Sequence, residues 1–85
     1  MPELSRFFGI VIGMYYSEHG APHFHASYGE CSGSIEIESA RIHGSLPPRV
    51  ERLVLEWAHL HKAELIENWS RARVRLPLVP IQPLE

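Results

Sequence analysis

The chain has little of what builds disulfides, cysteine-based zinc sites or membrane spans. It contains one cysteine among 85 residues, Cys31, which excludes an internal disulfide and a cysteine-based zinc site. None of its apolar runs reaches the ~18 residues that a membrane-spanning helix needs. The N-terminal stretch lacks the basic start and small-residue cleavage site of a secretory signal. These absences predict a cytoplasmic protein that does not enter a membrane.

The chain also lacks an excess of positive charge. Eight Lys and Arg residues stand against ten Asp and Glu residues, for a net charge of −2. Such a balance gives no general attraction to nucleic acid, so any contact with RNA would need a local basic patch. Three arginines, Arg71, Arg73 and Arg75, are candidates for contacts with phosphate or with an acidic partner, and a solvated surface is the alternative.

The length and the hydrophobic content of 45% predict one folded domain over residues 1–85. We expect an α+β fold in three parts. Residues 1–45 should form a small antiparallel sheet of three to four strands, and residues 46–75 a long helix, kinked or divided in two, that packs on the sheet. Residues 76–85 contain three prolines and should form an extended tail.

Strand patterns fill the first half of the chain. Residues 7–16 are apolar on both alternating faces, which predicts one central strand covered on both sides. Residues 23–28 and 31–38 alternate between polar and apolar, and Gly29-Glu30 between them suits a type II′ hairpin turn. Residues 41–43 can add a short edge strand.

The register of the predicted hairpin places the histidines. With Gly29-Glu30 as the turn, His23 falls opposite Glu36 on the outer face of the sheet. His25 falls opposite Ser34 on the same face. The remaining face carries the apolar side chains and should face the core.

A helical period begins at about Pro48, where the first turn of a helix tolerates proline. One apolar stripe contains Val50, Leu53, Val54, Trp57 and His61. A second stripe, with Leu65, Ile66 and Trp69, is rotated by roughly 80° from the first. We therefore expect a kink or break near His61 and Lys62. The apolar residues of the tail should pack on the protein itself or on a second subunit or partner chain.

Three imidazoles lie within seven residues, at His19, His23 and His25. The neutral imidazoles of His23 and His25, with the nearby carboxylate of Glu36, can hold a divalent metal ion such as zinc and leave a position open for water or substrate. Without any cofactor, one imidazole can transfer protons while a charged one stabilises an oxyanion, as phosphodiester chemistry needs. A third interpretation gives the histidines a structural role, in which they only fix the turn that the sequence predicts over residues 17–22.

Several segments carry a family resemblance that extends over nearly the whole chain. They are the start MPELSRFFGIVIGMYY, the block EHGAPHFHASYGE, the strand Ile35-Glu36-Ile37, the GSLPPR stretch, Trp57 with His61, the segment from Glu64 to Trp69, and the closing residues from Ile81 to Glu85. In these features the chain resembles the small prokaryotic proteins of the domain of unknown function family 4160. The resemblance implies membership of two-gene bacterial modules suspected of being toxin–antitoxin pairs, and it supplies no mechanism.

Three functions follow as expectations. The first is a partner-binding component on the effector side of a toxin–antitoxin-like module, in which His19, His23 and His25 act on RNA while Arg71, Arg73 and Arg75 hold phosphate. The second is a metal-binding module or metal-dependent hydrolase that uses the same histidines. The third is a non-enzymatic adaptor. In each case the expected partner is a second protein or another copy of this chain.

Overall fold

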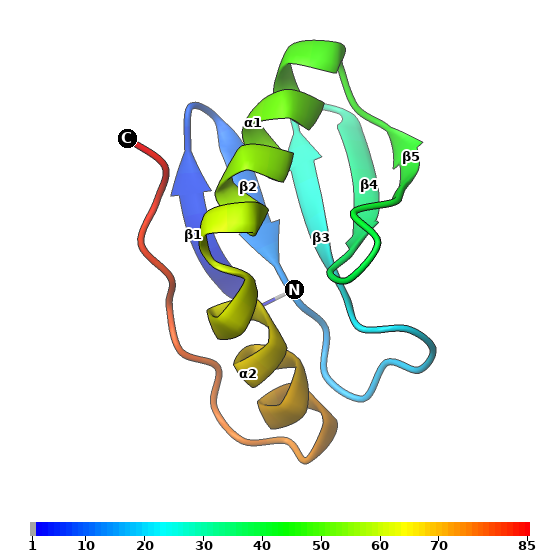
Figure 1. Ribbon diagram of the computed structural model, residues 1–85, viewed down its shortest axis with the longest axis vertical. Helices are drawn as coiled ribbons and strands as arrows, with labels where there is room; N and C mark the ends of the chain where they lie inside the picture. Colours follow the sequence, from blue (N-terminus) through cyan, green and yellow to red (C-terminus); the bar gives the residue numbers. More distant parts are fainter. Residues whose placement is uncertain (1) are drawn as a thin grey trace.

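A five-stranded antiparallel sheet, with one helix across a face and a second helix at the end of the sheet, makes up the structure, a computed structural model that describes residues 2–85 (Figure 1). The strands follow chain order across the sheet, and each pairs antiparallel with the next. Their bounds are β1 Glu3–Phe7, β2 Ile10–Gly13, β3 His23–Tyr28, β4 Cys31–Glu36 and β5 Ile42–Ser45. The helices are α1 Pro48–Leu60 and α2 Lys62–Arg73. The predicted α+β class is confirmed, whereas the prediction of three to four strands is too low.

The first hairpin accounts for the difference in strand number. Residues 7–16 do not form one strand, because Phe8 and Gly9 turn the chain back so that Phe7 pairs with Ile10. Both turn residues have positive φ, 50° at Phe8 and 80° at Gly9, as a type I′ turn requires. A two-residue turn usually uses Asn-Gly or Asp-Gly, so the bulky Phe8 gave no sequence signal for this turn.

The second hairpin, β3 to β4, has the predicted register. His23 pairs with Glu36, His25 with Ser34, and Tyr28 with Cys31 across the Gly29-Glu30 turn. Gly29 has a φ of 59°, which fits the first central position of a type II′ turn. Phe24 and Ala26, which alternate with the histidines, are buried in the core. The outer face of β3 is therefore free to present imidazoles.

The helices bury two differently directed stripes. The first stripe packs with Val50, Val54 and Trp57 buried, and α1 ends at Leu60. His61 has a non-helical backbone, with φ −120° and ψ 28°, so the predicted break is confirmed. On α2 the buried residues are Leu65, Asn68, Trp69 and Ala72, whereas Ile66 is exposed. Within residues 2–85, neither helix has the length and hydropathy to cross a membrane.

Residues after α2 form neither helix nor strand, and they run back along the side of the molecule where β1 lies (Figure 1). The N–H of Ile81 donates to the carbonyl of Leu4 at 2.8 Å, and Ile81 is buried in the core. The buried amide of Asn68 holds Val79 at two points, donating to its carbonyl at 2.9 Å and accepting from its N–H at 2.7 Å. The last residues thus pack on the protein's own sheet and helices, one of the two arrangements expected for them.

Candidate functional site

A carboxylate and two imidazoles converge where the chain enters β3. The Oε1 atom of Glu18 lies 3.1 Å from Nε2 of His23 and 2.8 Å from Nε2 of His25. One ligand-type atom from each residue lies within 4.8 Å of the other two. We call Glu18, His23 and His25 the carboxylate–histidine cluster.

Local structure explains why these three side chains meet. His23 and His25 are two residues apart on a strand, so both project from its outer face. Glu18 comes from the loop between β2 and β3. This loop reverses through Gly20, whose φ is 91°, and it is fastened to α2 by a hydrogen bond from the N–H of Ser17 to the carbonyl of Ala72.

Aromatic side chains flank the cluster on two sides. The ring of His23 lies against Trp69 with centroids 5.0 Å apart. The ring of His25 meets Tyr15 edge to face at 4.8 Å. The side chains of His23, His25 and Glu18 keep exposed fractions of 17%, 25% and 30%. The cluster is therefore partly shielded from water yet open to a small ion or molecule.

The hydrogen bonds of His23 fix which of its nitrogens carries a proton. Nδ1 lies 2.9 Å from the carbonyl oxygen of Ala21, and because a carbonyl only accepts, Nδ1 must be the N–H donor. In a neutral ring, Nε2 then carries a lone pair. That lone pair faces Oε1 of Glu18, which is also an acceptor. A proton or a cation between the two atoms would turn this repulsive contact into an attractive one.

Glu36, the carboxylate predicted to join the histidines, is hydrogen-bonded to other residues instead. Its Oε2 lies 2.8 Å from Nε2 of His43 on β5, and its Oε1 accepts a hydrogen bond from Ser39 at 2.9 Å. The hydrogen bond from His43, with a smaller contribution from Ser39, lowers the pKa of the Glu36 carboxyl. The structure thus brings together two of the three predicted metal-ligand residues and supplies Glu18 in place of Glu36.

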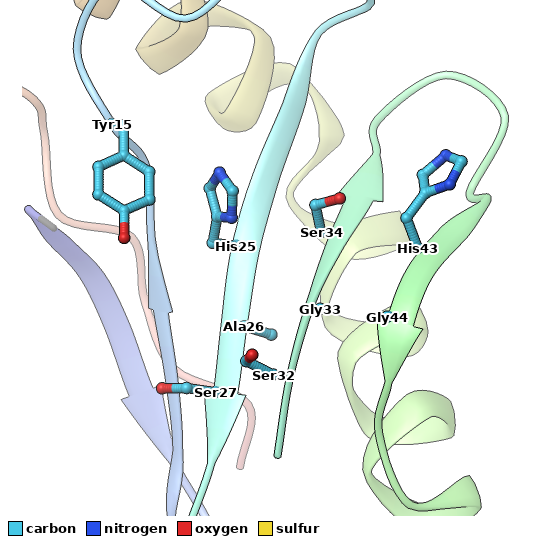
Figure 2. A pocket seen from close by; sticks show the side chains of 9 residues that line it. All are labelled: Tyr15, His25, Ala26, Ser27, Ser32, Gly33, Ser34, His43 and Gly44. Carbon is cyan, nitrogen blue, oxygen red and sulfur yellow. The ribbon is translucent and has the colours of Figure 1, made fainter. Parts of the chain in front are cut away.

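A hollow of about 370 Å³ lies on the outer face of the sheet next to the cluster (Figure 2). Three of its residues form one row across the strands, because His25 pairs with Ser34 and Ser34 pairs with His43. Figure 2 shows this row with Tyr15 beside His25. The full lining is Tyr15, His25, Ala26, Ser27, Ser32, Gly33, Ser34, His43 and Gly44. His25 belongs to both the cluster and the hollow, so the two are continuous.

With this geometry in view, comparison with known proteins identifies the family. The model of the domain of unknown function DUF4160 matches residues 9–70. The chain belongs to the DUF4160 family. A search of curated proteins and a search of solved structures gave no match. The segment matched by the DUF4160 model contains the whole cluster, the hollow and both ends of the Glu36–His43 contact.

The other residues predicted for the site of this DUF4160 protein lie apart from the cluster. His19 is exposed and is not one of the grouped ligands. Arg71 donates to Glu67 and to the carbonyl of Pro77, which ties α2 to the chain that follows. Arg73 and Arg75 are exposed. Within residues 2–85, no hydrogen bond or ion pair joins an arginine to the cluster.

Sequence reasoning missed two functional candidates of this DUF4160 chain, Glu18 and His43. Glu18 lies five residues before His23, in a segment read only as a turn. The signal that could have found it is a carboxylate in the loop that leads into the strand with the two histidines. His43 lies two strands from His25, and its place in the row depends on the pairing of β5, which the sequence indicated only as a short edge strand.

Proposed function

We propose that this protein binds a divalent metal ion of the zinc class through Glu18, His23 and His25. The observation that carries the proposal is the convergence of three ligand atoms, one each from Glu18, His23 and His25, within 4.8 Å of one another. The carbonyl of Ala21 holds the other nitrogen of His23, and metal-binding imidazoles commonly donate their second N–H to such a group.

The donor atoms suit zinc in kind and in spacing. Two histidines and a glutamate form a known ligand set of catalytic zinc sites, which leave a fourth position for water or substrate. Zinc bonds of about 2.0–2.1 Å in a tetrahedral site place neighbouring ligand atoms about 3.3 Å apart. The separations of 3.1 and 2.8 Å are a few tenths of an ångström shorter. A small movement of the Glu18 side chain would therefore admit the ion.

The chemistry that follows is that of a metal-bound water. A zinc ion held by Glu18, His23 and His25 would act as a Lewis acid and would supply a nucleophile at neutral pH. The hollow beside His25 would hold the substrate. The proposal thus covers a metal-binding module and extends to a metal-dependent hydrolase.

Calorimetry on tag-free, EDTA-stripped protein tests metal binding. Zn²⁺ is expected to bind with a stoichiometry of one. At a hundredfold excess over Kd it should stabilise the fold by about 2.7 kcal/mol, which raises Tm by roughly 10–20 °C for a chain of this size.

The double variant His23→Ala/His25→Ala should lose both signals. The variant His59→Ala, at an exposed histidine of α1, should keep them. Absence of stoichiometric binding, or equal binding by the double variant, would refute the proposal.

We also propose a role as the effector-side partner of a two-gene, toxin–antitoxin-like module that acts on RNA. Resemblance to the family supports it, together with an aromatic residue typical of protein interfaces, Phe8, which is 53% exposed at the β1–β2 turn. Induced expression in bacteria should arrest growth and fragment cellular RNA. The double histidine variant should abolish both effects, and His59→Ala should retain them. Normal growth with intact RNA would contradict this role.

A further inference from the structure

The hollow on the outer face of the sheet has a chemical character of its own. Its polar side chains are the hydroxyls of Tyr15, Ser27, Ser32 and Ser34 and the imidazoles of His25 and His43. These groups can all donate hydrogen bonds. The lining contains no carboxylate and no apolar side chain larger than that of Ala26. A ligand rich in acceptor oxygens would therefore be matched along the row.

Each of the two imidazoles that line the hollow contacts a carboxylate. Glu18 lies against Nε2 of His25, and Glu36 lies against Nε2 of His43, both at 2.8 Å. In His43 the contact with Glu36 fixes Nε2 as a donor, so Nδ1 donates to a ligand oxygen when the ring carries both protons.

We infer that the hollow binds the phosphoryl group of a small phosphate ester, with one phosphoryl oxygen at the open position of the metal. This inference rests on the proposed metal site. A divalent ion with the single negative charge of Glu18 leaves a net charge of +1 at the His25 end of the row, which favours an oxyanion. The Ser34 hydroxyl supplies a hydrogen bond on the far side, and the charged form of His43 supplies a second one from Nδ1.

The backbone around His43 is built to hold this arrangement. Gly44 has a φ of 123°, and a Cβ there would lie 2.7 Å from both the Ser32 carbonyl oxygen and the Gly33 Cα. Only glycine lets β5 approach β4 this closely, and that pairing places His43 opposite Ser34. The strand spacing puts the Cα atoms of His25 and His43 about 10 Å apart, a gap that a phosphoryl group can bridge between two side chains.

The size of the hollow narrows the ligand further. About 370 Å³ lies at the small end of ligand pockets, which span ~300–1,000 Å³. It exceeds what a phosphoryl group fills and leaves room for a sugar or a nucleoside. Tyr15, 45% exposed beside His25, offers a ring on which a planar base can stack. A mononucleotide is accordingly the probe of choice.

Sequential calorimetric titrations test the inference separately from metal binding. Zn²⁺ is titrated first, excess metal is removed by desalting, and AMP or adenosine is titrated next. AMP is expected to bind the zinc-loaded protein at least tenfold more tightly than adenosine, which lacks the phosphoryl group. Ribose 5-phosphate should bind more weakly than AMP but more tightly than ribose.

Variants identify the groups involved. His43→Gln and Ser34→Ala should each weaken AMP binding at least fivefold while zinc affinity stays within twofold of wild type. Glu51→Gln, on α1 away from the hollow's lining, is the matched control and should change neither. Equal affinity for AMP and adenosine, or unchanged AMP binding by His43→Gln, overturns the inference even if zinc binds. If zinc does not bind, the proposed metal site is overturned instead. AMP is then titrated into the metal-free protein, and it must bind more tightly than adenosine for the hollow to keep a phosphoryl role.

Discussion

The Trp57→Ala variant is expected to lose about 3–5 kcal/mol of folding free energy, the usual cost of removing a buried tryptophan. Trp57 is fully buried and packs against Phe7 and Phe24 with ring centroids 5.6 and 5.8 Å away. Its Nε1 donates to the carbonyl of Gln82 at 2.9 Å. One side chain thus joins α1, two strands and the C-terminal residues. The free energy of unfolding of an 85-residue chain is about 4–13 kcal/mol, so this loss removes a large part of its stability.

Urea denaturation followed by circular dichroism measures the effect. Leu60→Ala is the matched control, since Leu60 lies on the same helix but is 62% exposed, and its change should stay within about 0.5 kcal/mol. Trp57→Phe should lie between the two, because it keeps ring packing and loses the hydrogen bond to Gln82. A loss below about 1.5 kcal/mol for Trp57→Ala would show that the core does not depend on this residue.

The parts of the fold that could be predicted are those in which local pattern and tertiary burial agree. In the β3–β4 hairpin, alternation and a glycine at the first turn position point to the same register, and that register is observed. The helix break near His61 followed from two stripes that one straight helix cannot bury together. Both features follow from the spacing of apolar and polar side chains along one or two adjacent elements.

The parts that could not be predicted depend on contacts that override local pattern. Phe8 adopts a left-handed backbone and is exposed, although its neighbours read as a continuous apolar strand. Asn68 is buried on α2 because Val79, eleven residues later, returns to satisfy both ends of its amide. A helical wheel that ranks residues by hydropathy places Ile66 inside instead. In each case the residues that determine the conformation lie outside the short stretch of sequence over which a pattern is assessed.

The candidate site shows the same limit. Register correctly placed Glu36 opposite His23, yet pairing of backbones does not decide which side chains bond. His43 on the next strand approaches Glu36 diagonally and takes its carboxylate. Glu18 reaches the histidines only because its loop folds back over the strand end and is held by α2. Loop conformation of this kind leaves no periodic trace in a sequence.

Glu18→Gln should reduce zinc affinity more than 100-fold, because loss of a supporting partner alone typically costs 10–100-fold and Glu18 is proposed as a ligand. The same change should leave the metal-free protein as stable as wild type or more stable by about 1 kcal/mol. Because both imidazoles contact the same atom, Oε1, the glutamine amide nitrogen in its place can donate to the lone pair on Nε2 of His23. The repulsive contact between two acceptors would then become a hydrogen bond.

Measured at pH 8, the opposite changes in zinc affinity and in the stability of the metal-free protein separate two roles of the cluster, a metal site and a structural ion pair. If Glu18 and His23 serve as a structural ion pair, Glu18→Gln must destabilise the metal-free protein, because it removes the charge that attracts a protonated ring. Glu36→Gln is the matched control: it breaks the contact with His43 and should leave zinc affinity intact. The reverse result, in which Glu36→Gln abolishes zinc binding and Glu18→Gln does not, would restore Glu36 as the third ligand and require the loop to move away. Thermal melts of both variants, with and without Zn²⁺, therefore decide which carboxylate completes the site.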